Sequence, residues 1–363
     1  MSYGRCLDSK FYALHLCRGV ESSWKQEIPL NVWEYGEGNM KAVICKQWGP
    51  PESLVVENIP SLKADKAHVI VKVKACGVNF PDTLIIQGKY QYKPDLPFSP
   101  GAEIAGVIKE LGQGVSGIEV GDRVLAFIGW GGFSEEVSVP VDKIIHIPEG
   151  MDFKTASAFV MTYGTSCYAL KHRAQLKSGE TLLVLGAAGG IGLAAVELGK
   201  IMGARVIASA SSDDKLAVCK EYGADELINY STQNFRSIIS EITNGQGVDV
   251  VCDPVGGDLS EQAFRSTGWK GRFLVMGFAS GEISRIPLNL PLLKGSSIVG
   301  VFWSDFIRRE KETYAYVLQE LTKWYAQGKL KPLVSKIYPL EQAALALNDI
   351  VQRRVTGKIV LVP

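Results

Sequence analysis

The sequence predicts an α/β fold in which a doubly wound parallel sheet is joined to a second, β-rich domain. Over residues 164–303, short apolar runs alternate with helical stretches, which is typical of a parallel sheet covered by helices on both faces. Residues 40–163 instead contain short β-like runs separated by Gly, Pro and Asp. Such a pattern indicates a small, mostly antiparallel domain.

Composition restricts the possible partners. The 363 residues are 46% hydrophobic and 21% charged, with a net charge of +1, as in a globular chain of about two domains. The low net charge gives no electrostatic footprint for nucleic acid or an anionic membrane, and no apolar run reaches the ~18 residues of a membrane helix. Seven cysteines without C-x-x-C spacing indicate reduced thiols. We therefore expect a cytoplasmic protein with no nucleic-acid or membrane partner.

Residues 1–39 form an extension that does not resemble the remainder of the chain. Basic residues around residues 11–16 would suit a transit peptide, whereas five acidic residues in the same extension argue against one. A cloning artefact or a misassigned start is an equal alternative. The extension is left unassigned, and the first domain is expected to begin at Met40.

The expected strands of the first domain follow one another at short intervals. They are residues 41–46, 54–58, 69–75, 105–111, 123–127 and 134–139. In the second domain, strands are expected near Leu182, Val206, Glu226, Val248, Arg272 and Ser297, with helices such as 214–222 between them. A long amphipathic helix (308–327), a helix (340–351) and a strand (357–362) come last, and we expect them to return to the first domain.

The second domain begins with a strand, a glycine-rich turn and a helix. Residues 182–185 form a continuous apolar run, as in a strand buried on both faces. Gly186, Gly189 and Gly192 then remove Cβ atoms where the backbone turns and approaches a ligand, so N–H groups at the helix start can bind a diphosphate. The G-A-A-G-G-I-G spacing is a weak motif alone, but residues 205–209 complete the βαβ unit. The alternative is a glycine-rich turn without a ligand.

The end of the next strand predicts which dinucleotide binds. An NAD-binding protein usually places a carboxylate there, against the ribose 2′-hydroxyl, and this chain has Ala210. Ser211, Ser212 and Lys215 follow, and they suit a 2′-phosphate because charge-assisted hydrogen bonds to a phosphate are strong. NADPH is therefore favoured over NADH. Alternatively, one serine caps a helix and Lys215 is a solvated surface residue.

Motifs in a fixed order resemble the medium-chain dehydrogenase/reductase superfamily: KACGVNFPDTLIIQGKY, PGAEIAGVI, GDRV and the AAGGIG turn. Within it, TYGTSCYAL, DPVGGD, MGFASG and TGKIVL are similar to the zinc-free NADPH:quinone oxidoreductase branch. The resemblance covers residues 40–363. It implies a GroES-like catalytic domain (40–163 and 304–363) that is discontinuous around a Rossmann NADPH-binding domain (164–303), in a homodimer.

The resemblance also implies that no metal is used. Zinc-dependent relatives carry a Cys-His pair in the first motif and a His before the Glu in the second, where this chain has Asn79-Phe80 and Ala102-Glu103. These side chains cannot replace thiolate and imidazole at a tetrahedral zinc. Without a Lewis acid, the small-molecule acceptor must already be electrophilic, as a quinone or an activated alkene is, and positioning becomes most of the catalytic task.

By resemblance, Asn79, Asp82 and Tyr90 lie beside the nicotinamide. Asn79 would orient the cofactor or the substrate carbonyl, Asp82 would hold the loop, and Tyr90 would donate a hydrogen bond or a proton. Asp82 as a loop-capping carboxylate and Tyr90 as a wall of the pocket remain alternatives. A tyrosine that is common between these two positions in the branch is Leu84 here.

The other cofactor contacts lie on several segments. They are Ala188, Gly189, Gly190 and Ile191 at the turn, Thr165 near the ribose, Ser211, Ser212, Lys215 and Tyr230 at the 2′-phosphate, and Gly277, Phe278, Val301, Phe302 and Lys358. Lys358 as a surface lysine is an equal alternative. Phe98, Trp130, Phe278 and Trp303 are candidates for an apolar cleft that suits a flat ring, although core packing is the favoured interpretation of each.

The main hypothesis is therefore an NADPH-dependent quinone reductase. A reductase of activated C=C bonds, such as an alkenal or enoyl reductase, is the alternative. A dinucleotide- or RNA-binding protein without turnover is a weaker one. The homodimer is expected to pair residues 297–302 of two copies at a sheet edge, because an apolar edge strand is otherwise an aggregation hazard.

Overall fold

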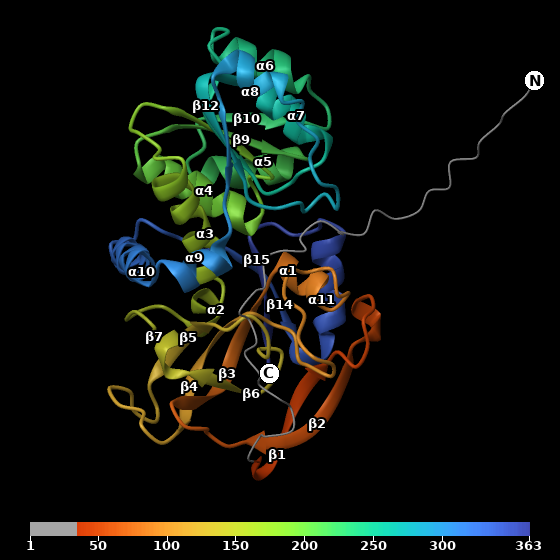
Figure 1. Ribbon diagram of the computed structural model, residues 1–363, viewed down its shortest axis with the longest axis vertical. Coiled ribbons are helices and arrows are strands. Elements are labelled where there is room, and N and C mark those ends of the chain that lie inside the picture. The colour runs from red at the N-terminus through yellow and green to blue at the C-terminus, as the bar shows by residue number, and fades with distance from the viewer. Residues whose placement is uncertain (1–34) are drawn as a thin grey trace, which may run out of the picture. The chain divides into compact units, whose positions relative to one another are not determined.

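The computed structural model describes residues 35–363, and it has the predicted α/β architecture with two main sheets (Figure 1). One sheet has six strands, all parallel, in the order β10-β9-β8-β11-β12-β13. Its strands are β8 (Thr181–Leu185), β9 (Arg205–Ala210), β10 (Glu226–Asn229), β11 (Val248–Asp253), β12 (Thr267–Val275) and β13 (Ser297–Gly300). The order reverses at β8, so the crevice above its carboxyl end is the expected ligand position.

The second sheet has mixed pairing, in the order β14-β15-β3-β4-β5-β7, with β6 also paired to β3. Its strands are β3 (His68–Val78), β4 (Glu103–Leu111), β5 (Arg123–Phe127), β6 (Glu136–Pro140), β7 (Ile145–His146), β14 (Val334–Pro339) and β15 (Lys358–Val362). The antiparallel pair β1 (Tyr35–Ile44) and β2 (Val55–Leu62) forms a separate ribbon. Because β15 pairs with β3, the segment after the parallel sheet completes the second sheet.

Helices cover both sheets. The α-helices are α1 (Phe80–Ile85), α2 (Phe153–Ala156), α3 (Thr165–Cys167), α4 (Gly190–Ile201), α5 (Asp213–Glu221), α6 (Phe235–Ile242), α7 (Asp258–Arg265), α8 (Asn289–Lys294), α9 (Trp303–Arg309), α10 (Lys311–Ala326) and α11 (Ala343–Val351). The other helical turns are η2 (Pro51–Ser53), η3 (Val141–Lys143), η4 (Val160–Gly164), η5 (Tyr168–Arg173) and η6 (Leu340–Gln342).

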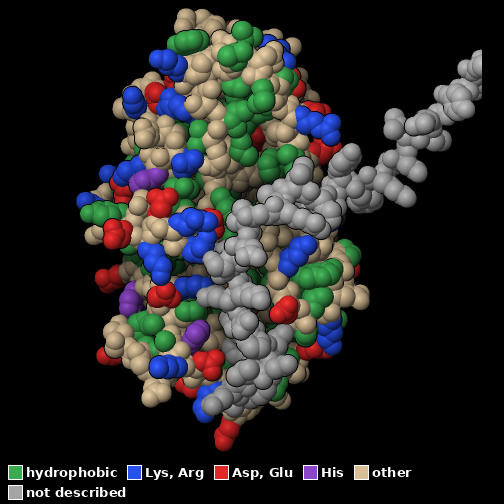
Figure 2. Space-filling view, viewed as in Figure 1, with side chains coloured by type: hydrophobic (Ala, Val, Ile, Leu, Met, Phe, Trp, Pro, Cys, Tyr) green, Lys and Arg blue, Asp and Glu red, His purple; other side chains and the backbone are tan. Residues whose placement is uncertain are grey.

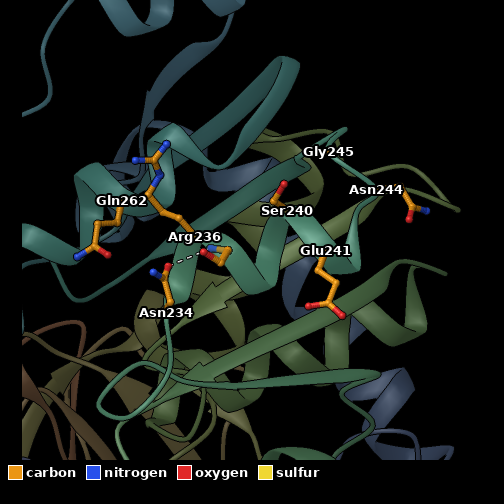
Figure 3. Close-up of a pocket in the computed structure, with 8 residues that line it drawn as sticks. Asn234, Arg236, Ser240, Glu241, Asn244, Gly245 and Gln262 are labelled. Atoms are coloured by element: carbon orange, nitrogen blue, oxygen red, sulfur yellow. Dashed lines mark hydrogen bonds between the residues drawn. The ribbon is translucent and has the colours of Figure 1, made fainter.

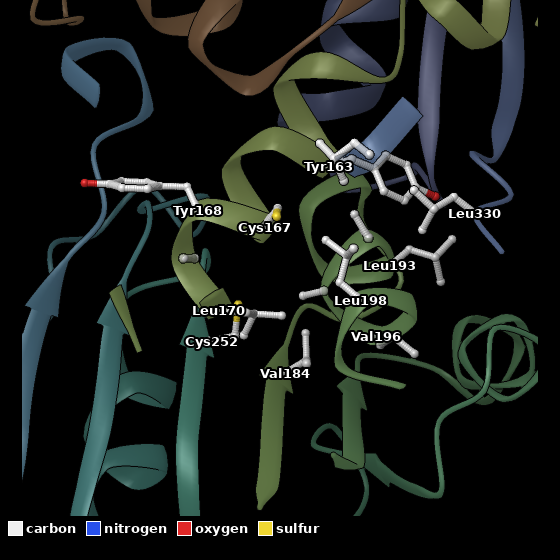
Figure 4. Close-up of a cluster of buried hydrophobic side chains, with 14 of the residues drawn as sticks. Tyr163, Cys167, Tyr168, Leu170, Val184, Leu193, Val196, Leu198, Cys252 and Leu330 are labelled. Atoms are coloured by element: carbon white, nitrogen blue, oxygen red, sulfur yellow. The ribbon is translucent and has the colours of Figure 1, made fainter. Parts of the chain in front are cut away.

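The largest core cluster joins the two sheets. Leu193 and Leu198 of α4 pack with Val184 of β8 and with Tyr163, as Figure 4 shows. The same cluster contains Leu125, which belongs to β5 of the second sheet. The apolar interior is therefore continuous from one sheet to the other, so a shared core holds the two sheets together.

The structure differs from the sequence expectations in several elements, among them the two-residue strand β7 (Ile145–His146), which was not expected. Strand β1 begins at Tyr35, five residues before the expected start at Met40, and the unassigned extension otherwise lies outside the described residues. The expected helix 308–327 is two helices, because Glu310 (φ −122°, ψ 54°) leaves the helical conformation. Strand β14 was not expected. Its exposed and half-buried positions alternate, so it has no continuous apolar run to mark it.

Candidate functional site

The glycine-rich turn leaves the N-terminus of α4 open to a ligand. Gly186 has a positive φ (+57°), and a Cβ on Gly192 would lie 2.3 Å from the Gly186 carbonyl oxygen, so both positions require glycine. Gly189 precedes the helix and offers no side chain to cap its N–H groups, and a Cβ there would have no neighbour closer than 3.4 Å. An uncapped helix start with open space before it fits the diphosphate of a dinucleotide.

The start of β15 lies directly on this turn. The N–H of Gly357 donates to the carbonyl of Ala188 (2.7 Å), and Gly357 forms a parallel bridge with Gly189. A Cβ on Gly190 would lie 2.9 Å from Cδ of Lys358 and 2.9 Å from Cγ2 of Thr162. Glycine at residue 190 therefore makes room for the lysine side chain.

A carboxylate holds the loop that follows β3. The N–H of Asn79 donates to Oδ2 of Asp82 (2.7 Å) at the start of α1. Asp82 is 1% exposed, and burial raises its pKa to about 7, although the Asn79 N–H and Lys358 oppose the increase. Asp82 thus serves as a loop-capping carboxylate, the role that the sequence left as one of two alternatives. Through this buried hydrogen bond, Asp82 fixes the backbone position of Asn79.

The side chain of Asn79 is bound within the protein. Its Nδ2 donates to the Gly77 carbonyl (3.2 Å) and to Oε2 of Glu103 (3.4 Å), and its Oδ1 accepts a hydrogen bond from Nζ of Lys358. Nζ of Lys358 also donates to the Val78 carbonyl (3.0 Å) and lies 3.6 Å from Glu103. Lys358 is 6% exposed, so the surface-lysine alternative is wrong.

Glu103 has a structural position that the sequence did not reveal. Its Oε1 accepts the N–H of Met161 in η4 (2.9 Å), while Oε2 faces Lys358. Burial raises the pKa of Glu103, Lys358 opposes that shift, and burial lowers the pKa of Lys358. The only signal in the sequence was the charged residue within the apolar run PGAEIAGVI.

The structure brings Ser211 and Lys215 together beyond the end of β9. Nζ of Lys215 lies 3.4 Å from Oγ of Ser211, and it donates to the carbonyl of Arg353 (2.8 Å). Ser212 is the N-cap of α5 and accepts the N–H of Lys215 (3.4 Å), which is the alternative weighed for this serine. Tyr230 is placed next to them by a hydrogen bond from its N–H to the Ala210 carbonyl (3.1 Å).

Arg353 was missed in the sequence. Its guanidinium donates to the Ser280 carbonyl (2.8 Å), while its own carbonyl accepts from Lys215. Arg353 therefore contacts both Lys215 and the loop that follows the Gly277-Phe278 turn. The basic pair in QRRVTGK, next to a motif of the branch, was an available signal.

The remaining predicted residues lie on three further segments. Oγ1 of Thr165 donates to the Met161 carbonyl, and the N–H of Val301 donates to the Val275 carbonyl (3.0 Å). Phe302 is 40% exposed and stacks on Tyr92 with ring centroids 6.1 Å apart. Phe278 packs over the Gly256 turn, where a Cβ would lie 2.9 Å from its ring.

Two of the aromatic residues proposed for an apolar cleft belong to the core. Phe98 and Trp303 are 5% and 3% exposed and lie in separate core clusters, as the packing interpretation expected. Trp130 is half-buried against the Phe98 cluster, and Phe278 is half-buried on the Rossmann side. The first two thus belong to the core and do not line a cleft.

A surface hollow elsewhere contains none of the predicted residues. Figure 3 shows its lining side chains, which come from α6, α7 and the loops beside α6. They are Asn234, Arg236, Ser237, Ser240, Glu241, Asn244, Gly245 and Gln262. Asn234 caps α6 by accepting the N–H of Ser237 (3.1 Å), so this lining residue has a structural role.

The described residues lack two further features, a metal-binding cluster and a membrane-spanning helix. Residues 35–363 contain no group of three or more His, Cys, Asp or Glu side chains that could hold a metal ion. Within the same part of the chain, no helix has both the length and the apolar character needed to span a bilayer. Basic and acidic side chains are interspersed on the face shown in Figure 2.

Comparison with known proteins identifies the family. Residues 65–149 match the alcohol dehydrogenase GroES-like domain, and residues 190–323 match the zinc-binding dehydrogenase domain. The quinone oxidoreductase-like protein 2 homolog of Nematostella vectensis is 38% identical over 350 residues, which cover 95% of each chain. The structure of Escherichia coli quinone oxidoreductase complexed with NADPH has a TM-score of 0.83 and 29% identity, over 89% of this chain and 100% of that one. The CurK enoyl reductase has a TM-score of 0.81 and 27% identity, over 90% and 99% of the chains.

A GroES-like domain combined with a parallel dinucleotide-type sheet defines a medium-chain dehydrogenase/reductase. The chain belongs to the quinone oxidoreductase branch of this superfamily and is an oxidoreductase. The resemblance stated from the sequence motifs is thereby confirmed.

Proposed function

We propose that this protein is a zinc-independent oxidoreductase that uses NADPH to reduce a quinone. The observation that carries the cofactor assignment is the end of β9, where Ala210 stands in place of a carboxylate and Lys215 lies beside Ser211. An NAD-type carboxylate would repel a 2′-phosphate, whereas the hydroxyl and the ammonium would bind it. The E. coli relative, whose structure contains NADPH, supports the same cofactor.

The residues that would hold NADPH come from the start of α4, the segment that follows β9 and the segment before β15. The N–H groups at the start of α4 would bind the diphosphate, and Ser211, Lys215 and Arg353 would surround the 2′-phosphate. Lys215 would exchange its present partner, the Arg353 carbonyl, for a charged phosphate oxygen. When bound, NADPH supplies a hydride.

Tyr90 is the proposed source of a proton near the acceptor. Burial raises the pKa of its hydroxyl above the ordinary value, so the hydroxyl keeps its proton at neutral pH. A side-chain hydrogen bond between Tyr90 and Ser304 opposes that shift. Ser304 itself is 9% exposed and lies at the start of α9.

Zinc independence is proposed from the chemistry of the side chains present. Asn79 and Ala102 occupy the motif positions where zinc-dependent relatives carry Cys and His. The carboxylate that remains, Glu103, faces the ammonium of Lys358 at 3.6 Å. Dialysis against a strong chelator should leave NADPH oxidation unchanged, with metal analysis by mass spectrometry as the check. Loss of activity that zinc alone restores would contradict this proposal.

A panel of acceptors tests the reaction. We expect NADPH oxidation with benzoquinones and larger flat quinones at rates well above those with 2-alkenals. The second candidate, reduction of an activated C=C bond, is favoured by the similarity to CurK enoyl reductase. Turnover of alkenals or enoyl thioesters without turnover of any quinone would reverse the assignment. Tight binding of NADPH without any productive acceptor would instead favour a protein that only binds the dinucleotide.

Two further properties are proposed with the reaction. We propose a homodimer that pairs β13 of two copies, because β13 is the last strand of the six-stranded sheet and Ile298 on it is 41% exposed. We also propose that the protein works in the cytoplasm. The five cysteines of the described residues are free and buried, which suits a reducing compartment, and cell fractionation would test it.

A further inference from the structure

The side chain of Lys358 contacts two parts of the proposed cofactor site. Its aliphatic stem lies against the glycine turn, since a Cβ on Gly190 would be 2.9 Å from Cδ and 3.3 Å from Cγ of the lysine. Its ammonium lies at the other end of the stem, beneath the loop that holds Asn79, where it donates to Asn79 Oδ1. One residue therefore spans from the diphosphate end of the site to its nicotinamide end.

The ammonium is directed toward the Asn79 loop. Of its three N–H bonds, one goes to the Val78 carbonyl (3.0 Å) and another to Asn79 Oδ1, and the carboxylate of Glu103 lies 3.6 Å away. Lys358 is 6% exposed. An ammonium engaged in this way satisfies buried acceptors of the loop, whereas a lysine that bound a diphosphate would present its N–H groups to the crevice.

The Asn79 amide depends on this ammonium for its orientation. With Oδ1 bound to Lys358, Nδ2 faces the Gly77 carbonyl (3.2 Å) and Glu103 (3.4 Å). Asp82 fixes the backbone of the same residue through its N–H. Without the ammonium, Oδ1 of Asn79 would lose its hydrogen-bond donor, so the amide would be held only by the two hydrogen bonds of Nδ2, and Glu103 would lose the cation it faces.

We propose that Lys358 is a positioning residue that sets the distance and orientation between the glycine turn and the Asn79 loop, and that it does not bind the diphosphate itself. This inference rests on the proposed function, because it concerns where NADPH places its nicotinamide. The aliphatic stem packs against Gly190 and keeps the turn at a fixed distance, while the ammonium holds Asn79 by a hydrogen bond. Lys358 thus acts through its neighbours on the reacting end of the cofactor.

The test compares NADPH with 2′-phospho-ADP-ribose, which keeps the diphosphate and the 2′-phosphate but lacks the nicotinamide. In Lys358→Met, the stem remains and the ammonium is lost. We expect the affinity for 2′-phospho-ADP-ribose, measured by calorimetry, to stay within about a factor of two. We expect kcat to fall about 10²-fold, as for a misplaced reacting group. The fluorescence of bound NADPH, which reports the nicotinamide environment, should also change.

A parallel fall in the affinities for NADPH and for 2′-phospho-ADP-ribose would overturn the proposal, because it would show a direct contact with the diphosphate. An unchanged kcat with unchanged NADPH fluorescence would overturn it as well. Lys336→Met is the matched control. It removes an ammonium from β14, the neighbouring strand, where Lys336 pairs with Asp349 at 2.6 Å, and it should change none of these quantities.

Folding is checked separately, since Lys358→Met leaves Glu103 buried without its cation. The double variant Lys358→Met/Glu103→Gln removes the carboxylate charge while keeping an oxygen that can accept from Met161. The circular dichroism spectrum of the double variant should match that of the wild type, which shows that it folds. We expect this folded double variant to show the same pattern of binding and turnover as Lys358→Met. Failure of the wild type to reduce any quinone would refute the proposed acceptor, while the calorimetric comparison would still decide the role of Lys358.

Discussion

Asp82 is a carboxylate whose ionisation opposes folding. Its pKa is raised to about 7 by burial, whereas an aspartate in an unfolded chain titrates near 4. The folded state therefore binds more protons than the unfolded state between these two values, and its stability falls as the pH rises from about 4 to about 7. Above about 7 this contribution no longer changes.

Replacement of Asp82 tests this sign. The variant Asp82→Asn keeps an oxygen that can accept the Asn79 N–H but has no charge to bury. We expect its melting temperature, relative to that of the wild type, to increase steadily between pH 5 and pH 7 and then to level off, as measured by circular dichroism. Two parallel stability profiles would show that Asp82 keeps an ordinary pKa in the folded protein.

Lys215 separates the two possible dinucleotides. Removing a charged hydrogen-bond partner of a phosphate costs about 2 kcal/mol, so Lys215→Ala should weaken NADPH binding about 30-fold and leave NADH almost unchanged. Lys220→Ala is the control on the same helix, because Lys220 is exposed and directed to the Asp225 carbonyl at 3.4 Å. Calorimetry with both cofactors provides the measurement. Equal losses for NADPH and NADH would exclude the 2′-phosphate role.

At the scale of elements, two substitutions in the turn between β8 and α4 should have different effects, one on stability and the other on cofactor binding. In Gly192→Ala, the new methyl group would meet the Gly186 carbonyl oxygen at 2.3 Å, so we expect a loss of about 1–3 kcal/mol in the free energy of unfolding. Gly189 has an extended backbone (φ −75°, ψ 170°), and a Cβ there would meet the Gly186 carbonyl oxygen at an ordinary contact distance of 3.4 Å, so Gly189→Ala should fold with wild-type stability. Its methyl group would instead occupy the approach to the diphosphate. Denaturant titration and NADPH calorimetry distinguish the two effects, and a destabilised Gly189→Ala would contradict this division.

Some helices, strands and site contacts could be predicted from the sequence, and others could not. Continuous apolar runs such as residues 182–185 marked the parallel strands well, because they are short and are bounded by turn residues, as expected of strands buried on both faces. The break at Glu310 escaped notice because no Gly or Pro marks it. In the site, Lys215 and Ser211 were found because they are close in sequence. The contacts of Lys358 and Arg353 were not, because each depends on a partner more than 70 residues away.

At the scale of the whole molecule, the proposed dimer can be tested on two edge strands, one expected at the dimer interface and one expected outside it. Ile298 on β13 and Ile337 on β14 lie at the ends of different sheets and are 41% and 48% exposed. A charge placed where two copies pair should separate them, so Ile298→Glu should sediment as a monomer while Ile337→Glu remains a dimer. Analytical ultracentrifugation measures this. A wild-type monomer, or a dimer unaffected by Ile298→Glu, would refute pairing through β13.

The position of β15 between β14 and β3 has a consequence for synthesis on the ribosome. All six strands of the parallel sheet are translated between residues 181 and 300, so this sheet can assemble while the nascent chain is still growing. The other sheet can pair β3 to β7 early, but it lacks β14 and β15 at one end until residues 334–362 emerge. The edge of β3 that accepts β15 therefore stays unpaired until the end of translation, and a ribosome that stalls near residue 340 would carry a finished nucleotide-binding half beside an unfinished catalytic one.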